Sequence, residues 1–189
     1  MKINIVTPSY RQHNIPELFN NYLEVKKLYP QHDFKWFIVF DKTKIQSISL
    51  VLMDLLEKEG VHYEFYGDGG IDGAQQRNRA LDQISDGYVY FLDDDNLMNT
   101  DLFKALEKYP DKSCLFRLYR RKNKRQITKI IIASGKVDTA QLLVRRETIG
   151  NIRWENSYDH DYRFINNVYM ANPAEFVFAP EFEAYHNWI

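Results

Sequence analysis

The chain lacks the features that would tie its fold to disulfides, to a bilayer or to a polyanion. Cys114 is its one cysteine, which excludes an internal disulfide and a cysteine metal site, and we expect a small buried apolar residue there. No stretch reaches the roughly 20 apolar residues that a membrane-spanning helix needs. A formal net charge of -1 at pH 7 gives no overall attraction to nucleic acid or to an acidic membrane.

We expect no export leader, because Met1 leads directly into the apolar run from Ile3 to Val6. We therefore expect a cytoplasmic protein. The 189 residues are 44% hydrophobic and 15% aromatic, which is enough for a substantial core. The chain is thus predicted to form a single domain over residues 1–189.

Short apolar runs alternate with amphipathic segments through the first half of the chain. This βαβαβ alternation predicts parallel strands with helices on both faces. Past Pro110 the rhythm changes, which predicts antiparallel additions, so the fold class is α/β with a Rossmann-like mixed, mostly parallel sheet. The predicted strands cover residues 3–7, 36–40, 61–66, 88–92, 113–119, 126–133, 137–145 and 175–178, and the predicted helices cover 16–28, 45–58, 74–84, a short turn from Thr100, and 158–169.

Three carboxylates stand at the end of one predicted strand. The aromatic and β-branched run from Tyr88 to Leu92 is followed at once by three aspartates and Asn96. A core cannot hold three adjacent unpaired charges, so the strand end should open onto a polar site suited to Mg²⁺ or Mn²⁺ and nucleotide phosphates. Asp95 is the preferred metal ligand, while Asp93 and Asp94 are expected to make water-bridged metal contacts and to bind ribose hydroxyls. A solvated turn capped by Asn96 is the alternative.

Polar residues also follow the first two predicted strands, and open parallel sheets bind ligands at the carboxyl ends of their strands. Thr7, Pro8 and Tyr10 end the first strand, and Asp41 ends the second. Tyr10 offers a ring for a base, Asp41 an acceptor for a base or ribose, and Arg77 a planar cation for a pyrophosphate. Core packing of Tyr10 and helix capping by Asp41 are the alternatives.

Three stretches of the first half carry a family resemblance: Val6 to Tyr10, Gly73 to Leu81, and Val89 to Asn96 running on to Phe103. In order and spacing they resemble the GT-A type nucleotide-sugar glycosyltransferases, and within them the β-1,3-glucuronyltransferase family. The pairing of QRNxAL with a following YFxDDDN is specific, whereas a DxD motif alone is weak. Residues 1–96 would then form the nucleotide-sugar donor half, and residues 97–189 the acceptor and catalytic half.

The second half matches the same family through fewer residues, around Asp138, Asp161 and His186. The resemblance implies a metal-dependent inverting transferase with Asp95 and Asp93 at Mn²⁺ or Mg²⁺. It also implies that Arg77 and His186 lie near the diphosphate, that Asp161 is the catalytic base and that Asp138 contacts the acceptor.

Inversion needs one carboxylate to take the proton from the attacking hydroxyl while cations stabilise the departing diphosphate. The residues alone do not settle which carboxylate does so. Asp159 is the rival of Asp161, and either could be a helix cap.

Two departures from the family bear on the donor. Asp72 stands where the family has a basic residue before Gly73, and Trp188 stands where it has an arginine. Fewer cations near the donor weaken the case for a glucuronic acid donor. We expect a UDP-sugar whose sugar can equally be a neutral hexose, deoxyhexose or pentose.

A local basic cluster lies between Arg117 and Lys129. A solvated hairpin tip is its structural interpretation, and a contact with an anionic glycan, a lipid-linked phosphate or a membrane surface is its functional one. Nucleic acid is not expected as a partner, because aromatic residues are sparse in the cluster. The acceptor is predicted to be a glycan or a lipid-linked molecule, and a homodimer or a fused domain is an option for completing its cleft.

Two other functions fit parts of the pattern. A nucleotidyltransferase also uses a Rossmann-like sheet and a carboxylate-held metal, but it requires a glycine-rich loop with a basic residue directly after the first strand. Arg11 alone meets that requirement. A sugar-nucleotide sensor or lectin-like module that kept the donor site without catalysis is the alternative outside the enzymes.

Overall fold

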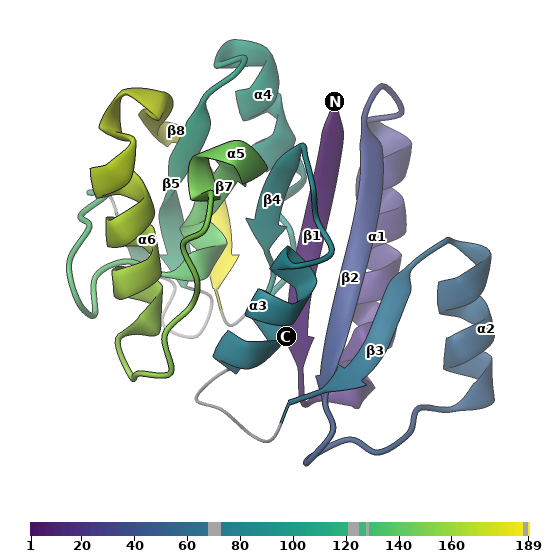
Figure 1. The fold of residues 1–189 in the computed structure, drawn as a ribbon. Helices are drawn as coiled ribbons and strands as arrows, with labels where there is room; N and C mark the ends of the chain where they lie inside the picture. The colour runs from purple at the N-terminus through teal and green to yellow at the C-terminus, as the bar shows by residue number, and fades with distance from the viewer. Residues whose placement is uncertain (68–72, 121–124, 128, 187–188) are drawn as a thin grey trace.

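The computed structural model describes residues 1–67, 73–120, 125–127, 129–186 and 189. Within these ranges an eight-stranded sheet forms in the order β3-β2-β1-β4-β7-β5-β6, and β8 also pairs with β5 (Figure 1). The strands are β1 (Lys2–Ser9), β2 (Asp33–Asp41), β3 (His62–Tyr66), β4 (Tyr88–Phe91), β5 (Ser113–Arg120), β6 (Arg125–Ile127), β7 (Leu142–Arg145) and β8 (Phe176–His186).

The first four strands are parallel, as the alternation of the sequence predicts. β1 lies between β2 and β4 and is parallel to both, and β3 extends the sheet beyond β2 in the same direction. Along β1, Ile3 and Ile5 enter one hydrophobic core while Val6 enters the other. Both faces of these strands are therefore covered, which explains why they are continuous apolar runs in the sequence.

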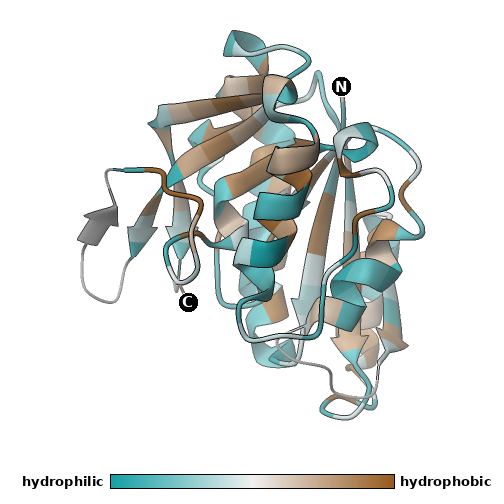
Figure 2. Cartoon of the chain, turned by 60° about the vertical axis from the view of Figure 1, so that its left-hand side comes forward, coloured by the Kyte–Doolittle hydropathy of each residue, from teal (hydrophilic) through white to brown (hydrophobic). Residues whose placement is uncertain are grey.

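The helices divide between the two faces of the sheet (Figures 1 and 2). α1 and α2 contribute buried side chains to the first core, and α3 and α6 contribute to the second. The expectation of helices on both faces is thus confirmed. The helices are α1 (Ile15–Leu28), α2 (Leu50–Lys58), α3 (Ala74–Leu81), α4 (Ala105–Lys108), α5 (Arg146–Ile149) and α6 (His160–Ala171), with 3-10 turns η1 (Gln12–Asn14), η3 (Thr100–Lys104), η5 (Thr139–Gln141) and η6 (Pro173–Glu175).

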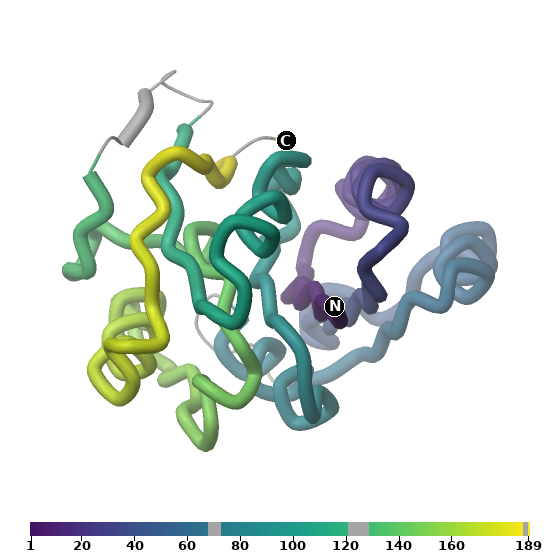
Figure 3. Tube along the Cα trace, turned by 90° about the horizontal axis from the view of Figure 1, so that it is seen from above, coloured from purple at the N-terminus to yellow at the C-terminus, as the bar shows by residue number. Residues whose placement is uncertain are grey.

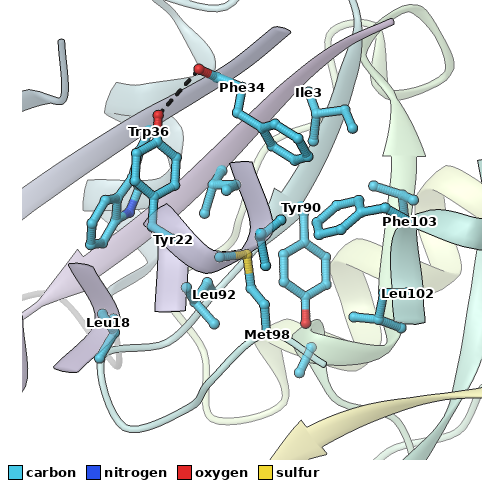
Figure 4. Packing of buried hydrophobic residues seen from close by; sticks show 14 of the residues in the cluster. Ile3, Leu18, Tyr22, Phe34, Trp36, Tyr90, Leu92, Met98, Leu102 and Phe103 are labelled. Carbon is cyan, nitrogen blue, oxygen red and sulfur yellow. Dashed lines mark hydrogen bonds between the residues drawn. The ribbon is translucent and has the colours of Figure 1, made fainter. Parts of the chain in front are cut away.

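Aromatic side chains fill the first core (Figure 4). The Tyr22 hydroxyl donates to the Phe34 carbonyl at 3.2 Å, and the ring of Tyr22 lies 5.2 Å from that of Trp36. Phe103, which follows the acidic triplet, meets the rings of Phe34 and Tyr90 edge-on. This packing fixes the segment after β4 against β1 and β2, and so fixes the place of the triplet.

The later strands extend the sheet beyond β4. β7 is antiparallel to β4 and to β5, and β6 is antiparallel to β5, which confirms the predicted antiparallel additions. β8 runs parallel to β5 along its whole length (Figure 3). It is much longer than the predicted strand at 175–178, because pairing resumes at Glu183 after an irregularity that contains Pro180, which has no N–H to donate.

Three predicted boundaries are wrong for local reasons. The helix predicted from Ile45 starts at Leu50, because the Ser49 hydroxyl accepts from the Leu52 amide at 3.2 Å and caps it there. The strand predicted over 126–133 ends at Ile127. The extended segment predicted over 137–145 begins as the η5 turn, where Asp138 and Gln141 form a capping box. No helix in the described ranges is long and apolar enough to cross a membrane.

Candidate active site

A cavity of about 640 Å³ opens at the carboxyl ends of β1, β2 and β4. The strand order reverses here, since the chain proceeds from β1 to β2 and β3 on one side and returns to β4 on the other. Such reversals leave a crevice that α/β proteins use for ligands. All the predicted site residues except Thr7 line this cavity. Thr7 faces the core instead, where its hydroxyl accepts from Trp36 Nε1 at 2.9 Å, so its predicted nucleotide contact could use only its backbone.

Asp94 holds the loop after β1 against the loop after β4. It is 1% exposed, and its Oδ2 accepts from the Tyr10 and Arg11 amides, both at 2.8 Å, and from the Ser9 hydroxyl at 3.1 Å. Its Oδ1 accepts from Arg11 Nη1 at 2.7 Å. Asp94 thus fixes the backbone from which the Tyr10 ring projects, a role that the sequence analysis did not foresee. Its predicted contact with ribose or metal-bound water stays a prediction.

Tyr10 and Asp41 line the cavity at the ends of β1 and β2. The Tyr10 side chain is 46% exposed, which excludes core packing, and the Arg11 guanidinium lies 4.2 Å from its ring centroid. Asp41 is buried at the end of β2, and its Oδ1 accepts from the Thr43 amide at 2.9 Å and from the Thr43 hydroxyl at 2.6 Å. Asp41 therefore closes a local turn while still lining the cavity, and the predicted alternative that it caps the following helix is wrong, because Ser49 caps α2.

The start of α3 comes very close to the end of β1. Gly73 has a φ of +83°, and a Cβ on it would lie 2.5 Å from Pro8 Cβ, so glycine is required there. This approach brings the buried Arg77 side chain beneath the acidic triplet, where Nη2 pairs with Asp93 and the guanidinium lies 4.8 Å from the Trp154 ring centroid. Burial opposes the charge of Arg77, but Asp93 and Asp161 raise its pKa above the ordinary value.

The surroundings of Asp93 disfavour its charged form. Burial raises its pKa to about 6, Arg77 opposes that rise, and Asp138 and Asp161 reinforce it. Six aspartates line the cavity against two arginines and one lysine. A diphosphate would be repelled by such a surplus unless a cation accompanied it.

The donor set fits a divalent ion that is shared with a substrate. Among the residues that the structure describes, no three acidic, histidine or cysteine side chains form a complete metal site. Mg²⁺-type sites commonly use one or two carboxylates and complete the shell with phosphate oxygens and water. The Asp95 side chain is 25% exposed and lies 3.0 Å from Arg11 Nη1, so Asp95, with Asp93 beside it, could hold the ion in that way.

His186 at the end of β8 reaches the same cavity. Its Nε2 lies 3.1 Å from Asp138 Oδ2, and Asp138 Oδ1 accepts from the Ala140 amide at 3.0 Å. Burial lowers the pKa of His186, but the Asp138 carboxylate more than offsets this and raises it; the histidine and the amide in turn lower the pKa of Asp138 against its own burial. β8 therefore returns the end of the chain to the site, and the Ile189 amide also donates to the Asp95 carbonyl at 3.0 Å.

The two candidate bases lie in different surroundings at the start of α6. Asp161 lines the cavity. Asp159 does not, and its Oδ1 accepts instead from Arg163 Nε at 2.7 Å on the outer surface. Position therefore favours Asp161.

Several lining residues were missed by sequence reasoning. His160 and Tyr158 precede Asp161, and Lys44 and Gln76 also line the cavity. Gln76 is 1% exposed, its Nε2 donates to the Tyr66 carbonyl at 3.3 Å, and its Oε1 is buried without a partner among the residues that the structure describes. A signal existed for Gln76, which is the first residue of the QRNxAL motif, and for Tyr158, an aromatic residue among charges.

Arg121, Lys122 and Lys124 of the basic cluster lie outside the described residues, as do Asp72 and Trp188. Within the described part, Arg117 Nη2 lies 3.5 Å from Glu183 Oε1. That pair belongs to the β5 and β8 ladder, so Arg117 contributes to the sheet.

Comparison with known proteins identifies similar folds at low sequence identity. No protein-family model matches the chain, and no curated protein matches it in sequence. TarS 1-349 from S. aureus is similar with a TM-score of 0.74 at 18% identity, over 98% of this chain and 60% of that one. Its complex with UDP-GlcNAc gives 0.72 at 18% identity, over 98% and 58%.

Two further structures extend the comparison. The mannosyltransferase PcManGT from Pyrobaculum calidifontis, in complex with GDP-Man and Mn²⁺, gives a TM-score of 0.68 at 14% identity, over 98% of this chain and 56% of that one. A putative glucose-1-phosphate thymidylyltransferase from Bacillus anthracis, in complex with a sucrose, gives 0.54 at 11% identity, over 95% and 85%.

These likenesses establish the fold. The chain has the GT-A type α/β fold of nucleotide-sugar glycosyltransferases, with a mixed, mostly parallel sheet. It spans about three fifths of TarS 1-349. The narrower resemblance to β-1,3-glucuronyltransferases stays a prediction.

Proposed function

We propose that this chain is a metal-dependent, inverting glycosyltransferase that moves a sugar from a UDP-linked donor to a hydroxyl of a glycan or a lipid-linked acceptor. One observation carries the proposal: the loop after β1, the acidic triplet after β4 and Asp161 of α6 face one cavity. The likeness to TarS in complex with UDP-GlcNAc and to a mannosyltransferase in complex with GDP-Man supports a nucleotide-sugar donor.

The donor half, residues 1–96, would bind the nucleotide. The exposed face of Tyr10 can stack on a base, and Asp41 can accept from a base or ribose. Arg77 compensates the charge of the triplet, and His186, which pairs with Asp138 on the acceptor side, would lie near the diphosphate. A divalent ion on Asp95 and Asp93 would neutralise charge on the departing diphosphate.

The acceptor half, residues 97–189, would supply the base. Asp161 takes the proton from the acceptor hydroxyl as that oxygen attacks the anomeric carbon from the face opposite the leaving diphosphate. Tyr158, which is 91% exposed at the cavity, offers a ring on which an acceptor sugar can stack. Asp138, between His186 and the η5 turn, can orient the acceptor. A cytoplasmic location and completion of the cleft in a homodimer belong to the same proposal.

The fold leaves a nucleotidyltransferase as the second candidate, because a putative thymidylyltransferase also resembles this chain. A nucleotidyltransferase needs a cation in the loop after the first strand that is free to bind phosphate. In this chain Arg11 pairs with Asp94 and Asp95, which favours the glycosyltransferase over the nucleotidyltransferase. A non-catalytic sugar-nucleotide sensor is the third candidate, and it would tolerate loss of Asp161.

Isothermal titration of UDP with and without Mn²⁺ tests the donor site. Wild type should bind UDP with Mn²⁺, and Asp95→Ala should lose the metal-dependent part. Asp101→Ala is the matched control, because its side chain is 60% exposed and pairs with Lys104 outside the cavity; it should bind as wild type does. Absence of UDP binding under both conditions would contradict the UDP assignment and direct the titration to GDP and dTDP.

A further inference from the structure

His160 is held rigidly beside the proposed base. It is 5% exposed, and its ring meets that of Trp154 edge-on at 5.7 Å. Its Nδ1 lies 2.7 Å from the Ser157 carbonyl oxygen. A carbonyl oxygen can only accept, so Nδ1 carries a proton in every protonation state of the ring.

The fixed proton on Nδ1 decides what Nε2 can do. In the neutral ring, Nε2 is an unprotonated nitrogen with its lone pair available, and it lies 3.0 Å from Asp161 Oδ1. Oδ1 is buried and has no other polar partner within the described residues. The arrangement therefore offers a proton on the carboxylate a short path to the ring.

We propose that His160 is a positioning residue for Asp161, which orients the carboxylate and takes up the proton that Asp161 removes from the acceptor hydroxyl. The inference rests on the proposed function. In the reaction the acceptor O–H bond breaks and its oxygen forms the bond to the anomeric carbon. The bond from that carbon to the diphosphate breaks, with its electron pair leaving on the diphosphate. The proton moves through the Asp161 carboxylate to Nε2, which leaves an imidazolium and a regenerated carboxylate.

A pH dependence follows, because only the neutral ring can accept that proton. The charged and polar groups that face His160 are Asp161 on its own helix, the Ser157 carbonyl before it and Arg77 on α3. Burial and the charge of Arg77 lower the pKa of His160. The hydrogen bond and the charge of Asp161 raise it by more, so the net shift of the pKa is upward. Turnover should therefore increase as pH rises through a value above the ordinary 6.5 of histidine.

Activity measurements on three variants test the inference. His160→Gln keeps an N–H that can reach Asp161 but cannot titrate. It should lose about tenfold or more in kcat, part of the roughly 10²–10⁴ that general base catalysis contributes, with KM for the acceptor unchanged. The decrease in turnover on the acid side of the pH profile, called the acid limb, should disappear in this variant near neutral pH. His160→Ala removes orientation as well and should lose more. Glu155→Gln is the control, because this 49% exposed carboxylate contacts Arg163 at the surface and should leave both kcat and the limb unchanged.

An NMR titration separates this inference from the proposed function. The His160 ring should titrate at lower pH in Asp161→Asn than in wild type, whether or not a donor sugar is known. A His160→Gln enzyme with wild-type kcat and an unmoved acid limb would overturn the inference, as would a His160 titration insensitive to Asp161→Asn. Failure of wild type to bind any nucleotide or to transfer any sugar would instead overturn the proposed function. Circular dichroism melting of His160→Ala distinguishes misfolding from loss of chemistry.

Discussion

On the proposed donor side of the cavity, arginines pair with the acidic triplet, and on the proposed acceptor side, histidines pair with Asp138 and Asp161. A guanidinium stays charged throughout the physiological range, whereas an imidazole changes charge within it. Under the proposed function, the donor side would meet a diphosphate whose charge hardly varies, and the acceptor side would move a proton. The difference teaches that one cavity can combine a fixed electrostatic half with a titrating half. The pairs are Arg77–Asp93 and Arg11–Asp94 on the donor side, and His186–Asp138 and His160–Asp161 on the acceptor side.

The largest expected effect concerns the proposed base itself. Asp161→Asn keeps the shape of the side chain but cannot accept the hydroxyl proton, so turnover should fall by roughly 10²–10⁴-fold while metal-dependent UDP binding is retained. Asp159→Asn should stay near wild type, because Asp159 pairs with Arg163 outside the cavity. Steady-state kinetics with a transferable donor and UDP titration measure both. The reverse ranking would move the base to Asp159 and break the comparison on the acceptor side.

An intermediate effect is expected on the arginine-held side. Asp94→Ala removes the acceptor of two backbone amides and leaves Arg11 without its most buried partner. The free energy of unfolding should fall by about 3 kcal/mol, as for other broken buried pairs. Asp54→Ala, whose 62% exposed side chain pairs with Lys58, should change it by less than about 0.5 kcal/mol. Urea denaturation compares the two, and equal losses would show that the Asp94 cluster does not organise the loop.

The smallest effect should appear as a pH slope from the histidine-held side. The pKa of His186 is raised in the folded state, so its pairing stabilises fully below the unfolded value near 6.5 and the stabilisation is lost as pH rises through the folded pKa. The lowered pKa of Asp138 adds stability above its unfolded value of 3.8, lost as pH falls. His186→Gln should flatten the decline of stability between about pH 6 and pH 8.

Denaturation of both proteins across that range measures the slope. The exposed His13→Gln should keep the wild-type slope. The two donor-side arginines should add none of it, since neither titrates there; Asp93, whose pKa is raised to about 6, adds a decline at the lower end of the range that His186→Gln leaves in place. If the slope of stability against pH is the same in His186→Gln as in wild type, groups other than His186 cause it. The His186–Asp138 pair would then not belong to the titrating side of the cavity.

The sequence was sufficient for the parallel half of the fold and for the contents of the site. Alternating apolar runs and amphipathic segments place β1 to β4 and their helices, because periodicity and burial on both faces are local signals. The alternation of side chains along β1 also predicts that Thr7 points inward, because residues two apart lie on the same face and Thr7 follows Ile3 and Ile5 on that face. The length of β8 was not readable, because Pro180 and two glutamates interrupt its apolar pattern while β5 supplies the pairing.

By itself, the sequence identified ten of the eleven predicted site residues that meet at one cavity, from the strand ends for Tyr10, Asp41 and the acidic triplet and from the family resemblance for Asp138, Asp161 and His186. Only the tertiary structure decided what each one does there. Asp94 became the anchor of the first loop because β4 pairs with β1 and so brings Asp94 to Arg11, 83 residues away along the chain. His160 and His186 became partners of aspartates because α6 and β8 converge on the same edge. Strand and helix formation depend on neighbours in sequence. The protonation state and the partner of a charged side chain depend instead on the groups that tertiary packing brings within a few ångströms of it.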